Sequence, residues 1–385
     1  MDSLHDDNQP SSLLQQSPIF LLPSELLCEI FSLLASRGPL QLRHTLFVCK
    51  RWYNVVVSDQ KLWSTIILDR DFVDHFNLHG ALAQISRADA YIRACLERSA
   101  PFPLDVTLNR LFDKSDGLVF SREPYRFILD RLFKFGEPHH IQRYRSLFWY
   151  LDGTLYGRGI LIDLLPPSLE GLEYLFVKDL SFQNDPLTRF PQCPRLKEVH
   201  LVNHLEGTSP SYFLYRDYNH VEKLTYTSNT GWIDYDIPYI QRFNGIHTLV
   251  LEDATPPSTL AYSFLEEFEN TSIAHLHSLE TLKLIGLIPL YIIERLHTPV
   301  LKRLDIKKGS TALHSLHIVP LALLQSVLSI SICQRGLSTP PVFQHLRRVV
   351  CEAPLLTCLT GPLEIGELLK GEEWFTERNI VYNCI

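Results

Sequence analysis

Several short motifs in the sequence contain residue types that could carry out chemistry. Imidazole pairs, which can bind a metal ion, occur at His139-His140 and at His275 and His277. Glycine-containing turns, which could hold a phosphate or a nucleophilic serine, occur at residues 157–159 and 207–211. Each motif needs further residues at fixed spacing before it could support ligand binding or catalysis.

The neighbouring residues do not complete any of these motifs. We find no cysteine or carboxylate at a recognised ligand spacing beside the histidine pairs, so we expect surface histidines or histidines with satisfied hydrogen bonds there, and no metal site. Residues 157–159, Gly-Arg-Gly, lack the third glycine of a dinucleotide-binding loop. Residues 207–211, Gly-Thr-Ser-Pro-Ser, depart from the G-x-S-x-G pattern of a nucleophile elbow. We therefore expect a protein that is not an enzyme and that uses no cofactor and no metal.

Bulk composition also restricts the class of protein. The chain has 385 residues, of which 45% are hydrophobic and 21% charged, as in a soluble globular protein of two or more domains. A net charge of -7 without a concentrated basic run argues against nucleic acid as a partner. No stretch approaches the roughly 20 uninterrupted apolar residues of a membrane span, so no membrane association is expected.

The cysteines and the first residues bear on the cellular compartment. Eight cysteines are spread along the chain without a C-x-x-C pair, which fits thiols in a reducing environment. Residues 1–17 are polar and contain acidic residues where a secretory signal would be basic, so they predict a disordered tail. We expect the protein in the cytoplasm, the nucleus or both.

An apolar block follows this tail. In residues 19–57, 23 of the 39 residues are apolar and six are charged. Pro23, followed by apolar residues at helical spacing, predicts a first helix; Gly38 ends it, and a third helix begins near Cys49. A helical unit of about 40 residues is marginal as a free-standing domain. The excess apolar surface must therefore be covered by the rest of the chain or by a partner protein.

Two segments of this block resemble the F-box. Residues 22–34 read Leu-Pro-Ser-Glu-Leu-Leu-Cys-Glu-Ile-Phe-Ser-Leu-Leu, residues 47–52 read Phe-Val-Cys-Lys-Arg-Trp, and residues 62–66 match the segment that commonly follows the motif. The resemblance implies binding to a Skp-type adaptor and, through it, to cullin and RING subunits. The positions that it implies dock onto the adaptor, or support docking, are Leu22, Pro23, Leu26, Ile30, Phe31, Val48, Cys49 and Trp52.

Other apolar residues of the block are expected to face inward, because a helix in a three-helix unit has an inner and an outer stripe. These are Leu27, Leu34 and Val56. The resemblance continues with less detail past the motif. Residues 91–99 and 103–108 are similar to the helix and strand that follow the F-box in many fungal members, and residues 143–147 to a later strand.

From Leu172 onward, an apolar-x-x-apolar-x-apolar pattern keeps returning. The first positions of successive units lie 19 to 33 residues apart, and most intervals fall within the ~20–29 residue period of leucine-rich repeats. The last two apolar positions of a unit point to one face of a short strand, so units must stack to bury that face. The units are Leu172/Leu175/Val177, Leu196/Val199/Leu201, Val221/Leu224/Tyr226, Ile246/Leu249/Leu251, Leu279/Leu282/Leu284, Leu301/Leu304/Ile306, Val327/Ile330/Ile332 and Leu346/Val349/Cys351.

These patterns predict an α/β protein in which a three-helix F-box is followed by an irregular leucine-rich-repeat-like solenoid with a curved parallel sheet. The predicted domains are the tail at 1–17, the F-box at 18–66 and a substrate-binding domain at 67–385. A generic α/β sheet with leucine-rich strands is the alternative fold. The concave face of a solenoid gathers side chains from many strands and is the natural site for a target protein. Candidate positions there are Phe176, His200, Thr225, Val250, Lys283 and Asp305.

The resemblance and the solenoid together predict the substrate-recognition subunit of a Skp–cullin–F-box ubiquitin ligase. Such a subunit acts by holding a target near a charged ubiquitin-conjugating enzyme and needs no reactive residue of its own. Two alternatives stay open: an adaptor-bound protein that never joins a cullin, and a hydrolase or transferase on an α/β domain. An enzyme should contain a deep pocket with convergent titratable groups, whereas we expect a shallow concave surface.

Overall fold

A computed structural model describes most of the chain. The described residues are 22–78, 84–109, 122–134, 138–150, 165–178, 191–203, 218–228, 236–254, 273–286, 288, 290–307, 321–333, 340–370 and 372–384. The predicted tail at 1–17 and the glycine motifs at 157–159 and 207–211 lie outside these residues.

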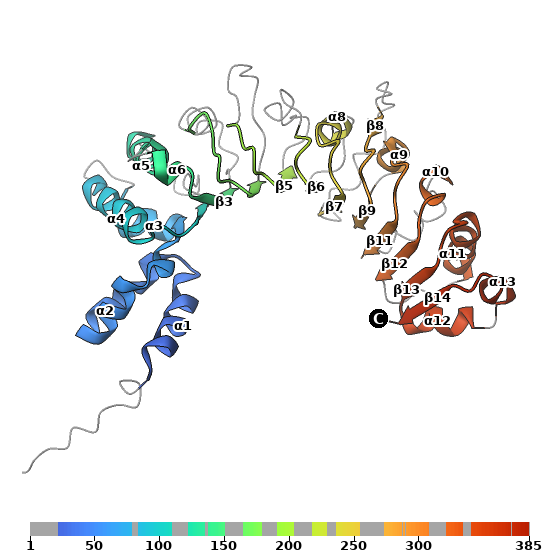
Figure 1. Ribbon diagram of the computed structural model, residues 1–385, viewed down its shortest axis with the longest axis horizontal. Helices are drawn as coiled ribbons and strands as arrows, with labels where there is room; N and C mark the ends of the chain where they lie inside the picture. The colour runs from blue at the N-terminus through green and yellow to red at the C-terminus, as the bar shows by residue number, and fades with distance from the viewer. Residues whose placement is uncertain are drawn as a thin grey trace, which may run out of the picture.

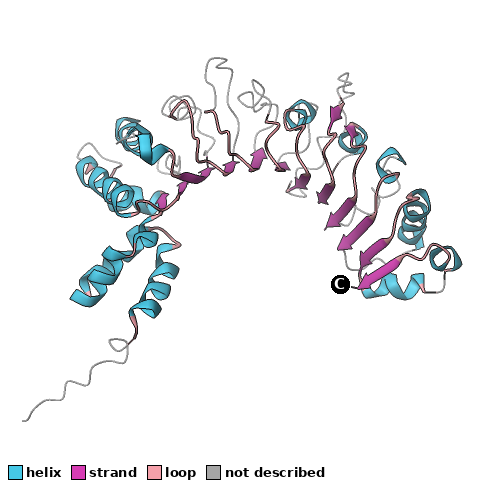
Figure 2. Ribbon diagram, in the orientation of Figure 1, coloured by secondary structure: helices cyan, strands magenta, loops and turns pink. Residues whose placement is uncertain are grey.

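The described residues form a helical N-terminal unit followed by an arc of parallel strands (Figure 1). The strands line the inner side of the arc, most helices between them lie along its outer side, and α1 and α2 project from its N-terminal end (Figure 1 and Figure 2). The helices are α1 (Ser24–Ala35), η2 (Pro39–Phe47), α2 (Lys50–Ser58), η3 (Gln60–Trp63), α3 (Arg70–His75), α4 (Ile85–Arg98), α5 (Arg122–Lys134), α6 (Pro138–Ile141), α8 (Asp236–Gln241), α9 (Leu290–Glu294), α10 (Leu321–Leu324), α11 (Pro340–Glu352), α12 (Leu363–Leu369) and α13 (Glu373–Thr376).

Twelve strands form one sheet in which every described pair is parallel. In sheet order they are β1 (Thr65–Leu68), β2 (Leu104–Asn109), β3 (Tyr144–Tyr150), β4 (Tyr174–Lys178), β5 (Glu198–Asn203), β6 (Lys223–Ser228), β7 (Thr248–Asp253), β9 (Thr281–Ile285), β11 (Arg303–Lys307), β12 (Ser329–Cys333), β13 (Cys358–Gly361) and β14 (Val381–Cys384). A small second sheet pairs β8 (Ala274–His275) with β10 (Leu296–His297). The predicted mixed α/β architecture, with a solenoid and a curved parallel sheet, is confirmed.

In several strands, side chains alternate between a buried face and the concave face, whereas β6, β7 and β11 each contain three successive buried residues. In β4 and β9 every second residue is buried and its neighbours are half-exposed. Strand pairing lines up the buried leucines across the sheet, so that Leu224 lies beside Leu249 and Leu249 beside Leu282. The period-2 alternation that predicted the strands therefore also produces the core, because stacking is the way in which one unit covers the apolar face of the next.

One predicted repeat unit is wrong. Leu346, Val349 and Cys351 were assigned to a strand, but they lie in α11. Buried Leu346, Val349 and Val350 are spaced i, i+3 and i+4, which is the spacing of a helix face as well. The strand of this repeat comes later, at β13, where Leu359 is buried. The sheet also begins earlier than the repeat pattern indicated, with β1 to β3 preceding Leu172.

The helical unit and the sheet share one continuous core. Buried Leu42 of η2 and Ile66 of β1 belong to the same hydrophobic cluster, which extends along the sheet. Gly38, with a φ of 101°, turns the chain between α1 and η2 where an added Cβ would lie 3.2 Å from the Cβ of Ile67. Trp63 donates a 2.8 Å hydrogen bond to the carbonyl of Val56. The helices are thus packed directly on the first strand without an intervening linker.

Glycines allow two pairs of neighbouring repeats to approach closely. An added Cβ would lie 1.9 Å from the carbonyl oxygen of Gln142 at Gly171, and 1.9 Å from that of Asn219 at Gly245. Backbone atoms cannot move aside as a flexible side chain can, so Gly245→Ala should shift the turn that leads into β7. We expect the free energy of unfolding to fall by about 1–3 kcal/mol. Urea unfolding of the variant measures this loss.

The control for this prediction is the neighbouring exposed residue. Asn244→Ala should change the free energy of unfolding by less than about 0.5 kcal/mol. Equal stability of Gly245→Ala and the unaltered chain would show that the turn can relax without cost.

Candidate functional site

The inner stripe of α1 forms the core of the helical unit. Leu27, Phe31 and Ala35 recur at intervals of four residues and are buried. The ring of Phe31 meets the ring of Trp52 edge to face, with 5.2 Å between the centroids. Leu27 and Val56 are buried as predicted. This stripe fixes the spacing between α1 and α2 and so holds the outer surface in place.

A second apolar stripe of α1 faces solvent. Leu26, Ile30 and Leu33 lie at i, i+4 and i+7, which places them on one helix face. Ile30 is 40% exposed and Leu33 is 75% exposed. Leu34, predicted to be internal, is 38% exposed, so that prediction is wrong. A continuous apolar stripe that is exposed on a helix is typical of a surface that binds another molecule.

The end of η2, the residues that follow it and the first turn of α2 add further exposed apolar side chains. Phe47 is 87% exposed, and Val48 and Tyr53 are also exposed. Both η2 and α2 pack against α1. Of the fourteen large apolar side chains that are exposed among the described residues, seven lie between residues 26 and 53. We call the set Leu26, Ile30, Leu33, Leu34, Phe47, Val48 and Tyr53 the outer apolar surface.

The residues predicted to dock or to support docking fall into three groups by exposure. The exposed members are Pro23, Leu26, Ile30 and Val48, the half-buried members are Leu22, Cys49 and Trp52, and Phe31 is buried. Cys49 caps α2, because its Sγ accepts a 3.5 Å hydrogen bond from the backbone N–H of Trp52. The guanidinium of Arg51 donates to the carbonyl of Leu22 and ties the start of α1 to α2. Phe31, Cys49 and Trp52 therefore shape the surface from beneath.

Sequence reasoning missed four members of the outer apolar surface: Leu33, Leu34, Phe47 and Tyr53. For Leu33 a signal was available, because it completes the i, i+4, i+7 series that begins at Leu26. For the other three, the local sequence does not separate an exposed apolar residue from an internal one.

A comparison with known families decides what this helical unit is. Residues 19–69 match the F-box-like family. The helical unit is an F-box-like domain. Domains of this kind commonly bind Skp-type adaptors. The match ends at residue 69, so the fungal-type resemblance and the leucine-rich-repeat assignment remain predictions. No curated protein matches the chain.

The second candidate site is the concave face of the sheet. The six predicted positions occupy one row, because strand pairing places each beside the next: Phe176, His200, Thr225, Val250, Lys283 and Asp305. Their side chains alternate with the buried leucines of the same strands, so the row lies on the inner side of the arc (Figure 2). The structure thus brings all six positions into one row; Val250 and Asp305 are buried, at 7% and 2% exposure, and the other four are half-buried.

Aromatic rings gather at one end of this row. Phe148, Tyr150, Tyr174, Phe176 and His200 come from β3, β4 and β5 and are half-buried; we call them the aromatic cluster. The centroid of Phe176 lies 4.8 Å from that of Tyr150 and 4.7 Å from that of His200. The pKa of Tyr174 is raised, mainly by burial and also by the carboxylate of Glu198. A ligand on the concave face would therefore contact the half-buried aromatic rings of this cluster.

His200 joins this cluster to a chain of hydrogen bonds. The hydroxyl of Thr227 donates to the carboxylate of Glu252 at 3.0 Å and lies 3.0 Å from Nε2 of His200. Because the single hydroxyl proton of Thr227 is used on Glu252, His200 must donate from Nε2. Burial lowers the pKa of His200, Glu252 opposes this shift, and Lys223 adds to it.

We therefore expect His200 to be neutral at pH 7 and to titrate below the ordinary value of about 6.5. As pH falls, the unfolded chain takes up this proton first, so stability should decline between pH 6.5 and the lower folded pKa. Glu252→Gln should lower the pKa of His200 further, because the carboxylate favours the charged ring. NMR titration of the imidazole measures both shifts. A titration midpoint of His200 above 6.5 in the unaltered chain would contradict the expected lowering of its pKa by burial.

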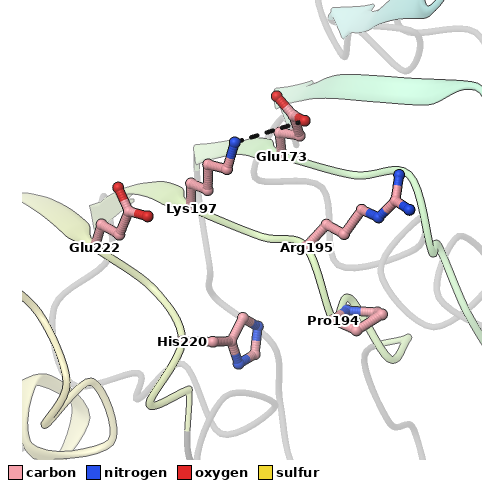
Figure 3. A pocket seen from close by; sticks show the side chains of 6 residues that line it. All are labelled: Glu173, Pro194, Arg195, Lys197, His220 and Glu222. Carbon is pink, nitrogen blue, oxygen red and sulfur yellow. Dashed lines mark ion pairs between the residues drawn. The ribbon is translucent and has the colours of Figure 1, made fainter.

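An open groove of about 390 Å³ runs along the edge at which the chain enters β4, β5 and β6 (Figure 3). Its lining residues are Glu173, Pro194, Arg195, Lys197, His220 and Glu222. Lys197 forms an ion pair of 3.7 Å with Glu173. In the backbone, the N–H of Lys197 donates to the carbonyl of Glu173 and the N–H of Glu222 to that of Lys197. These residues join consecutive repeats, which gives them a structural role.

His275 and His277 are exposed, and so is the neighbouring His297, whereas His140 is half-buried. The rings of His275, His277 and His297 lie 5.2 to 5.9 Å apart between centroids. Across the segments that the structure describes, no three ligating side chains are arranged to hold a metal ion. Within the same segments, no helix combines the length and apolar character needed to cross a membrane.

Proposed function

We propose that this chain is the substrate-recognition subunit of a Skp–cullin–F-box ubiquitin ligase. The F-box-like domain would bind a Skp-type adaptor, which connects the chain to cullin and RING subunits. The concave face would bind the target protein. The observation that carries the proposal is the outer apolar surface, because it lies on the one segment with a family match, at residues 19–69.

The proposed mechanism is proximity. A target bound on the concave face would be held near a charged ubiquitin-conjugating enzyme, so that its lysines meet the thioester at a high effective concentration. This chain would act without a reactive residue and is proposed not to be an enzyme itself. Seven cysteines in the described segments form no disulfide, which supports a location in the cytoplasm, the nucleus or both.

Reconstitution tests the proposal directly. The purified full chain is mixed with a purified Skp-type adaptor at micromolar concentration, and a cullin–RING complex is then added. We expect an equimolar complex of all components by size-exclusion chromatography with light scattering. Folded chain that ignores the adaptor would overturn the proposal. Adaptor binding without cullin recruitment would instead support a role outside cullin ligases.

A further inference from the structure

We propose that the concave face binds an extended segment of its target that carries a large apolar side chain and, about five to seven residues away, an anionic side chain. The inference rests on the proposed function, since it gives the chemistry of the target that the concave face would recognise. It follows from the different chemistry of the two ends of the concave row and from the distance between them.

The aromatic cluster favours an apolar side chain over a cation. Its rings are half-buried and packed edge to face or tilted, so they present apolar surface to whatever lies above them. A cation could also bind such rings. However, Lys178 beside Tyr150 and Glu252 near His200 bring one charge of each sign to the cluster, and Glu198 is paired with Lys223. The cluster therefore has no net negative charge that would favour a cation, and its ring carbons favour an aromatic or large aliphatic side chain.

The other end of the row is basic. The concave positions of β9 and β11 include three cations, Lys283, Arg303 and Lys307, and one carboxylate, Asp305. Asp305 is only 2% exposed and accepts a 2.8 Å hydrogen bond from Nε of Arg303, so its charge is offset within the chain. Lys283 and Lys307 form no ion pair among the described residues. We call these two lysines the basic pair.

The contrast with the rest of the chain makes the basic pair informative. The whole chain carries a net charge of -7, whereas the concave positions of β9 and β11 carry two more positive than negative side chains. A local excess of one sign on an oppositely charged protein attracts a ligand of complementary charge and fixes its orientation. The basic pair would therefore receive a carboxylate or a phosphate.

Strand spacing gives the distance between the two ends. Four strand intervals separate Phe176 on β4 from Lys283 on β9, and a fifth reaches β11. At about 4.8 Å for each interval, the two ends lie roughly 19–24 Å apart. An extended chain advances about 3.3–3.6 Å per residue, so five to seven residues bridge them. The short side chains of Thr225 and Val250 lie between the ends.

A library of random twelve-residue peptides, displayed and selected on the full chain bound to its adaptor, tests the inference. Enriched peptides should carry an aromatic or large aliphatic residue and an acidic residue five to seven positions apart. For a synthetic enriched peptide, Phe176→Ala should weaken binding about 30-fold. The double variant Lys283→Glu/Lys307→Glu should weaken it about tenfold or more, and less at high salt.

Matched variants separate binding from folding. Thr360→Ala changes the same row on β13, beyond the proposed footprint, and Lys370→Glu changes a charge at the C-cap of α12, outside the sheet. Both should leave peptide affinity within about twofold. Replacing the acidic peptide residue by lysine should restore binding to the double glutamate variant. If Phe176→Ala lowers the thermal midpoint, Tyr150→Ser probes the same cluster.

Each outcome bears on a different part of the inference. The inference would be overturned if the enriched peptides lacked the predicted spacing, or if the double glutamate variant bound them as tightly as the unaltered chain. In that case, weaker peptide binding by Phe176→Ala would still support a target site on the concave face. If no peptide were enriched, or if no concave variant changed peptide affinity, both the inference and the proposed target site on the concave face would be overturned. None of these outcomes bears on adaptor binding, which is measured separately. Exchanging the acidic residue for glutamate, phosphoserine or glutamine distinguishes a carboxylate from a phosphate.

Discussion

Ile30→Asp should lower the affinity of the chain for a Skp-type adaptor by at least about 100-fold, which corresponds to about 3 kcal/mol. A carboxylate placed within an apolar interface loses its hydration without gaining a partner. The free chain should tolerate the change, because Ile30 is 40% exposed and faces solvent. Isothermal titration calorimetry measures the affinity, and near-ultraviolet circular dichroism checks the fold.

Leu363→Asp is the matched control. Leu363 is also an exposed apolar residue, at 60%, but it lies on α12 at the opposite end of the arc (Figure 1). Its replacement should leave adaptor affinity unchanged. Phe31→Ala is unsuitable as a test of contact, because removing a buried phenylalanine should cost about 3–5 kcal/mol of stability. If folded Ile30→Asp bound the adaptor within threefold of the unaltered chain, the outer apolar surface would not be the docking surface.

Leu249→Ala should lower the free energy of unfolding by about 2–5 kcal/mol. Leu249 is fully buried in β7, between Leu224 and Leu282 of the neighbouring strands. In a solenoid each repeat contacts its neighbours, so the loss should concentrate around β7. Hydrogen exchange should show faster opening of β6, β7 and β9 with little change in α1 and α2. Adaptor binding should then survive while binding on the concave face weakens.

Thr248→Ala provides the control for this second prediction. Thr248 is the half-buried neighbour of Leu249 on the concave face of the same strand. Its truncation should change stability by less than about 0.5 kcal/mol. Uniform acceleration of exchange in Leu249→Ala, reaching the F-box-like domain, would instead mean that the shared core makes the whole chain one cooperative unit.

Much of the solenoid could be predicted because its signal is repeated. The pattern around Leu175, Leu224 and Leu282 recurs with similar spacing, and the buried face of each strand follows from it. The pattern failed around Leu346, where apolar residues at i, i+3 and i+4 satisfy a helix as well as a repeat. Longer-range packing decides between the two, and a short apolar run does not contain that information.

The two candidate sites differ in how far sequence could define them. The concave row was predictable, because positions between the apolar residues of parallel strands fall into register once the strands pair. The outer apolar surface was not, since Ile30 and Phe31 are adjacent, apolar and both motif positions. One is exposed and the other buried because η2 and α2 cover only one side of α1. That choice depends on tertiary packing.

Because one core runs from the F-box-like domain into the sheet, the number of repeats would set the distance between a bound adaptor and a bound target segment. Every repeat between the adaptor and a bound segment would add one strand interval, about 4.8 Å, to the separation between them. Gain or loss of a repeat in evolution would thus move the target stepwise relative to the ubiquitin thioester. Which lysine is modified would then be set by repeat number as much as by affinity.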